Sequence, residues 1–113
     1  LPLTPLEYRI TDACRSDGQG RFWVINYFFP GEGRHLRPPV KPEGPVEQLV
    51  ELQLADDRVQ PTTRAPLNLR HGQQGEARNW EALVRLPGRG FLVMTDRYPT
   101  TLLAFVPDPA ANP

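Results

Sequence analysis

The chain contains two similar stretches of about 19 residues, and this near-repeat limits the folds that it can adopt. Residues 79–99 are typical of a strand, a tight turn and a second strand, and a gap-free shift of 69 positions places residues 81–99 on residues 12–30. Both copies have an acidic residue opening one strand, a Gly-rich turn, an apolar second strand and an aromatic residue before proline. Four matches are identities and two are conservative: Ala82 with Ala13, Phe91 with Phe22, Val93 with Val24, Pro99 with Pro30, Glu81 with Asp12, and Tyr98 with Phe29. A true repeat predicts an array of similar β-sheet units, although chance can also produce so short a match.

Proline and glycine divide the rest of the chain into short apolar runs. The 14 prolines and nine glycines lie mostly between these runs, which is typical of short strands joined by turns. Residues 22–29 combine aromatic and β-branched side chains and predict a central strand. Residues 46–54 fit both a helical and an alternating pattern, of which we favour the strand. Residues 30–45 hold too many prolines for a ladder and predict a long surface loop.

These patterns predict an all-β fold in a single domain covering residues 1–113. The first unit, about residues 6–69, is expected to have four strands, and the second, about residues 78–107, three. Antiparallel four-stranded units side by side are the blades of β-propellers, so the chain is expected to form about two blades. Residues 108–113 are expected to be a disordered tail. The expected strands are 8–14, 21–28, 46–54, 57–69 interrupted by prolines, 80–86, 90–96 and 101–106.

Charge and cysteine content narrow the function. The 13 basic and 13 acidic residues cancel, which argues against nucleic acid and anionic lipid as partners. No apolar run is long enough for a membrane-spanning helix, and the first residues lack the layout of a signal peptide. The single cysteine, Cys14, cannot form an internal disulfide. The chain begins as a piece of a larger protein would.

Several segments together resemble a known group of proteins. The chain is similar to the C-terminal part of bacterial exported β-propeller proteins, loosely related to the esterase-like phytase and six-bladed lactonase propellers. The resemblance implies two final blades, partners in the remaining blades or a second copy, and a periplasmic or secreted location. It specifies no activity, because the matching motifs are those of blades in general. These motifs are residues 21–31, residues 46–51, residues 78–81 and residues 90–99.

A calcium site is the first candidate for chemistry. The first strand of each propeller blade lines the central channel, so Asp12 and Glu81 would face the same axis. With the side-chain oxygen of Asn79 they would supply the oxygen ligands that Ca²⁺ prefers, and the similar lactonase propellers hold a metal in this way. The alternative, which we favour, is that these acidic residues bind backbone amides of a neighbouring segment.

Other candidates are weaker. Asn26 and Asp96 at strand ends are candidate ligand-binding residues, but more often such residues cap turns. Trp80 could stack on a ligand, although packing between sheets is the more common role. His71, in an expected loop, is a weak catalytic candidate. Cys14 is expected to be a buried, unreactive thiol.

Three functions remain open from the sequence. The favoured one is a propeller segment with a structural and ligand-binding role that lines a channel and binds a small molecule. The second is part of a metal-dependent hydrolase acting on esters, lactones or phosphate esters. The third is a free-standing small β module for protein-protein contacts. No serine-hydrolase elbow and no phosphate-binding loop is visible.

Overall fold

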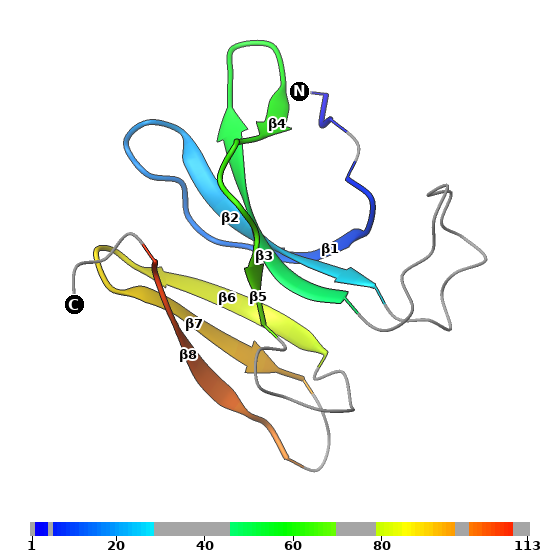
Figure 1. Cartoon of the computed structure of the whole chain (residues 1–113), viewed down its shortest axis with the longest axis vertical. Helices are drawn as coiled ribbons and strands as arrows, with labels where there is room; N and C mark the ends of the chain where they lie inside the picture. The colour runs from blue at the N-terminus through cyan, green and yellow to red at the C-terminus, as the bar shows by residue number, and fades with distance from the viewer. Residues whose placement is uncertain (1, 5, 29–45, 70–78, 97–99, 110–113) are drawn as a thin grey trace.

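The described part of the chain is built only from strands. The computed structural model describes residues 2–4, 6–28, 46–69, 79–96 and 100–109. These residues contain no helix, and therefore none long and apolar enough to cross a membrane. They form one five-stranded and one three-stranded sheet (Figure 1). The expected loop 30–45, His71 and residues 110–113 lie outside the described residues.

The first sheet is an antiparallel meander. β1 (Arg9–Ala13), β2 (Arg21–Phe28), β3 (Val46–Leu54) and β4 (Val59–Pro61) lie in that order, and β5 (Leu67–Asn68) also pairs with β3. The segment that admitted a helix is a strand, because β3 pairs with β2 along eight consecutive positions.

Prolines explain why the first sheet has five strands where four were expected. Both β4 and β5 lie along the same strand, β3, at separate positions. Pro61 is the last residue of β4, and Pro66 lies between β4 and β5. Proline has no backbone N–H and so donates no hydrogen bond to a neighbouring strand. The expected fourth strand over 57–69 is therefore present as two short pieces.

The second sheet contains β6 (Trp80–Leu86), β7 (Gly90–Thr95) and β8 (Leu103–Pro107), in that order. A three-residue turn, Pro87 to Arg89, joins β6 and β7. All strand pairs in both sheets are antiparallel. The one parallel contact among the described residues is an isolated bridge between Leu3 and Val59.

The hydrophobic core lies between the two sheets. It is made of side chains that are at most 7% exposed, and burial of each large one contributes about 1.5–3 kcal/mol. The rings of Trp23 and Phe91 meet edge to face, with centroids 5.2 Å apart. The core residues are Trp23, Ile25, Leu49, Leu69, Trp80, Leu83, Phe91 and Val93.

The two leading hairpins share a plan that includes a β-bulge. In β1 the extra residue is Thr11, and in β6 it is Glu81. The second strands of the hairpins both start at positions related by the shift of 69. The first strands of the hairpins correspond under a shift of 70 instead. Ala13 pairs with Val24, which lies 11 residues later in the chain, whereas Leu83 pairs with Val93, which lies only ten residues later.

One extra residue in the first turn therefore changes which acidic residues correspond. The gap-free alignment placed Asp12 on Glu81, whereas the strand register makes Thr11 the counterpart of Glu81. The counterpart of Asp12 is Ala82, since each lies one residue beyond its bulge.

Non-equivalent faces of the two hairpins meet in the core. The first sheet contributes Trp23 and Ile25, and the second contributes Phe91 and Val93. The shift of 69 relates Trp23 to Leu92, and because side chains alternate along a strand, Leu92 points away from the first sheet. The sheets are therefore stacked head to tail, and do not face each other through matching surfaces as a two-fold pair would.

Candidate functional site

Asp12 links the first strands of the two sheets. Its Oδ2 accepts a hydrogen bond of 2.8 Å from the backbone N–H of Leu83. The neighbouring Thr11 hydroxyl donates to the carbonyl oxygen of Trp80 at 2.9 Å. Both residues are half-buried. This geometry matches the structural interpretation of Asp12, in which the carboxylate holds a backbone amide.

Asn79 also takes part in contact between the sheets. It lies just before β6 with a φ of 55°, and its backbone N–H donates to Oε1 of Glu47 in β3 at 3.0 Å. Glu81 lies two residues away at the bulge and is half-buried. No three His, Cys, Asp or Glu side chains among the described residues come close enough together to hold a metal ion. A calcium site on Asp12, Asn79 and Glu81 stays a prediction.

Asn26 is a buried structural residue. It is 3% exposed, and its Nδ2 donates to the carbonyl oxygens of Tyr8 and Arg9 at 2.9 and 3.3 Å. Its Oδ1 accepts a hydrogen bond of 2.9 Å from Nε2 of Gln48. These hydrogen bonds satisfy both polar atoms of the Asn26 side-chain amide, which lies beside the β1 bulge. Asp96 follows β7 in the other sheet and is exposed.

Trp80 and Cys14 belong to the packing of the protein. Trp80 lies in the core, so its ring is not available as a stacking platform. Cys14 is half-buried; its sulfur accepts the backbone N–H of Trp23 at 3.3 Å and donates to the Arg15 carbonyl oxygen at 3.5 Å. Burial raises the pKa of the Cys14 thiol, which favours the unreactive protonated form.

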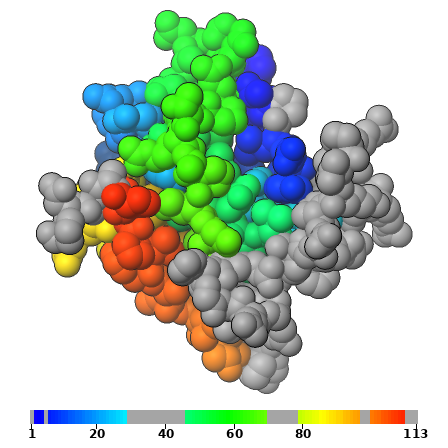
Figure 2. Space-filling model, in the orientation of Figure 1, coloured from blue at the N-terminus to red at the C-terminus, as the bar shows by residue number. Residues whose placement is uncertain are grey.

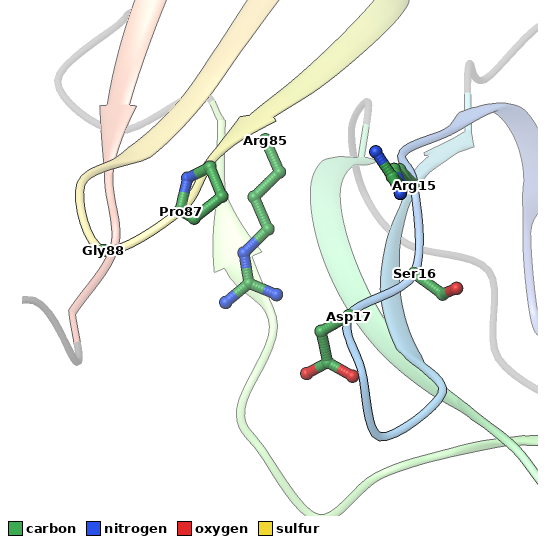
Figure 3. Close-up of a pocket in the computed structure, with 6 residues that line it drawn as sticks. All are labelled: Arg15, Ser16, Asp17, Arg85, Pro87 and Gly88. Atoms are coloured by element: carbon green, nitrogen blue, oxygen red, sulfur yellow. The ribbon is translucent and has the colours of Figure 1, made fainter.

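A surface pocket of about 460 Å³ lies between the turns of the two leading hairpins (Figure 3). The Arg85 side chain extends into the space between Pro87 and the turn that carries Ser16 and Asp17. The pocket could not be predicted from the sequence, because its two halves lie about 70 positions apart and no motif joins them. Its lining residues are Arg15, Ser16, Asp17, Arg85, Pro87 and Gly88.

Neighbouring side chains hold the Arg85 guanidinium in place. Its Nη2 lies 3.6 Å from Oδ2 of Asp108, and its guanidinium carbon lies 5.9 Å from the centre of the Phe91 ring. Asp108 also pairs with Nη1 of Arg64 at 3.7 Å. Asp108 was expected to begin a disordered tail, but it is 7% exposed, because these two arginines and the Arg89 carbonyl oxygen bind it.

Asp17 is neutralised within its own turn. Its Oδ1 accepts the backbone N–H groups of Gln19 and Arg21, at 2.8 and 2.9 Å, and its Oδ2 accepts Nε of Arg21 at 3.1 Å. These hydrogen bonds, led by that from the Arg21 backbone, lower the pKa of Asp17.

Arg15 is exposed, and its side chain forms no hydrogen bond or ion pair within the described part of the chain. Because Arg85 is paired with Asp108, the positive character of the pocket comes mainly from Arg15.

Comparison with known proteins identifies no relative of this chain. No family model matches it, and neither does any curated protein or solved structure. The hydrolase alternative stays a prediction, since His71 lies outside the described residues.

Proposed function

We propose that this chain is a segment of a larger β-propeller, with a structural and ligand-binding role beside the central channel. The observation that carries the proposal is the head-to-tail stacking of two similar hairpins, in which Trp23 and Ile25 meet Phe91 and Val93. Contact between non-equivalent faces does not close after two units. It continues until a ring or an open array is formed.

The arrangement of the first strands also supports a propeller. β1 and β6 lie next to each other and are joined by the hydrogen bonds of Thr11 and Asp12 (Figure 1). In a propeller the first strand of every blade lies beside the channel. β1 and β6 would then line it, and the pocket at their turns would lie at one mouth of the channel.

The ligand that best fits the pocket is a small molecule carrying an oxyanion, either a carboxylate or a phosphate. A guanidinium presents several N–H donors in a plane that matches such a group. Arg85 is oriented by Asp108 and Phe91, so little side-chain freedom would be lost on binding. Arg15 adds a second cation at the rim.

Electron microscopy of the assembly that contains this chain tests the architectural part of the proposal. The assembly would be isolated from its native source with an antibody against the chain. We expect ring-shaped particles with a central channel. A soluble, cooperatively folding monomer of 12.8 kDa as the native form would contradict it.

Phosphate titration followed by NMR tests the ligand-binding part. We expect phosphate to shift the Arg85 side-chain and Ser16 backbone signals. We expect Arg15→Gln to weaken phosphate binding about three- to tenfold without loss of stability, since the Arg15 side chain forms no hydrogen bond or ion pair among the described residues. Arg58→Gln, at an exposed arginine paired with Asp57 away from the pocket, is the matched control. Equal phosphate affinity in the Arg15 variant and the control would exclude the pocket as an oxyanion site.

A further inference from the structure

The side of the second sheet that faces away from the core is entirely apolar. Four of its side chains are well exposed: Val84 at 53%, Met94 at 42%, Leu103 at 67% and Phe105 at 51%. β8, which carries two of them, lies at the molecular surface (Figure 2). We call this surface the outer apolar face. By strand register its residues are Ala82, Val84, Leu86, Leu92, Met94, Leu103, Phe105 and Pro107.

The repeat shows what position this face holds. Leu92 and Met94 are the counterparts of Trp23 and Ile25 under the shift of 69. Across the ladder, Leu103 pairs with Met94 as Leu49 pairs with Ile25. In the first sheet these positions form the surface that the second sheet covers. The outer apolar face is therefore the same surface one unit further along, without its cover.

A second copy of the chain is poorly suited to be this cover. Head-to-tail stacking of two copies would require the far side of the other copy's first sheet. That side is already buried within the chain, because Val24, Phe28 and Leu52 are each at most 2% exposed. A preceding blade of a closed ring would need the same side, so closure of a ring requires these residues to be uncovered first. A surface that continues the head-to-tail stacking must therefore come from elsewhere.

We propose that the outer apolar face binds a further antiparallel β-sheet, supplied from outside these 113 residues, whose inner surface resembles that of the second sheet. This inference rests on the proposed function and names the partner of the segment. The partner sheet would present a Phe and Val pair like Phe91 and Val93. Its first strand would lie beside β6, as β6 lies beside β1.

Glu81 supplies a polar part of the same interface. Its counterpart, Thr11, binds the carbonyl oxygen of Trp80 and lies next to Asp12, which accepts a backbone N–H of β6. Ala82 replaces Asp12 in the second sheet and cannot accept a hydrogen bond through its side chain. Glu81 forms no side-chain hydrogen bond or ion pair among the described residues. A carboxylate cannot donate to a carbonyl oxygen as Thr11 does, so Glu81 can join this interface only as an acceptor, in the role that Asp12 has toward a backbone N–H in the first sheet.

An extended chain provides the test. A second copy of residues 70–109 is appended after residue 109, so that it can supply the partner sheet. A soluble paramagnetic agent then reports the exposure of the Met94 methyl group of the original unit by NMR. We expect relaxation of this methyl group to fall at least threefold relative to the 113-residue chain, and Glu81→Ala in the original unit to reverse part of that protection.

Charged substitutions on the face are the control. Leu103→Lys with Phe105→Lys, at exposed positions, should leave the 113-residue chain folded and should abolish the protection of Met94 in the extended chain. Equal exposure of Met94 in the two chains would overturn the proposal. Protection of Met94 in the 113-residue chain that rises with its concentration would also overturn it, since the occupant would then be a second copy.

The two proposals can fail separately. Native particles that form an open stack would contradict the propeller and leave the docking of a sheet intact. If the native particles are rings but Met94 stays exposed in the extended chain, the propeller stands and the docking of a sheet on the outer apolar face is contradicted.

Discussion

At the scale of single residues, Asp12 is the clearest link between the two sheets. Replacement by alanine would remove the acceptor for the Leu83 N–H, which lies in a partly buried contact. We expect Asp12→Ala to lower the free energy of unfolding by about 1–3 kcal/mol in urea denaturation. Asp57→Ala, at an exposed aspartate paired only with Arg58 among the described residues, should change it by less than about 1 kcal/mol. Similar effects of the two variants would mean that Asp12 does not hold the sheets together.

Asp17 gives the first turn a dependence on pH. Its pKa in the folded protein is lowered below the usual 3.8 because backbone amides of Arg21 and Gln19 bind the carboxylate. The stabilisation is therefore complete above the unfolded pKa and is lost as pH falls through the lower folded pKa. We expect the stability difference between the native chain and Asp17→Asn to shrink below about pH 3.8, measured by thermal unfolding across a pH series. A difference that is constant from pH 7 to pH 2 would contradict this.

Part of the candidate site could be predicted from single residues. Asp12 and Asn79 were singled out, and both lie where the two sheets meet. Asp12 joins β1 to β6 through a backbone amide, which was the favoured alternative, and the backbone N–H of Asn79 binds Glu47 in β3. The pairing of Arg85 with Asp108 could not be predicted. Asp108 follows β8, and only the pairing of β8 with β7 carries it back to Arg85.

At the scale of elements, the β6–β7 hairpin depends on one glycine. Gly90 has a φ of 154°, and a Cβ there would lie 2.2 Å from the Val106 carbonyl oxygen in β8. A backbone atom in a paired strand cannot move aside easily. We expect Gly90→Ala to lower the free energy of unfolding by about 2–3 kcal/mol or more in urea denaturation.

Gly18 is the matched control for that substitution. A Cβ at Gly18 would meet no atom within 4 Å, and its φ is not positive. Gly18→Ala should therefore change stability by less than about 1 kcal/mol. Comparable losses for the two variants would show that Gly90 does not lie in close contact with β8.

The strands were predictable because their boundaries are local. Proline and glycine end them, and an alternating apolar pattern distinguishes β3 from a helix. Two features could not be predicted in this way: the break between β4 and β5, and the register of the first hairpin. Both depend on single residues, namely a proline within the ladder and one extra position in the first turn.

At the scale of the whole molecule, the main finding is how the sheets stack. The sequence predicted an all-β chain of two antiparallel units, and the structure confirms the β-sheets. Which face of each sheet meets the other could not be predicted, because β2 carries large apolar side chains on both sides. The stacking places Leu92 and Met94 on the outer apolar face, and the proposals on the propeller and its partner sheet both follow from this placement.

A double-mutant cycle tests that stacking most directly. Free energies of unfolding are measured for Trp23→Phe, Phe91→Leu and Leu92→Ala, and for the two double variants that contain Trp23→Phe. Head-to-tail stacking predicts a coupling energy of about 0.5–1.5 kcal/mol between Trp23 and Phe91, whose rings are in contact, and none above about 0.3 kcal/mol between Trp23 and Leu92. Coupling of Trp23 to Leu92, its own counterpart in the repeat, with none to Phe91 would contradict the account.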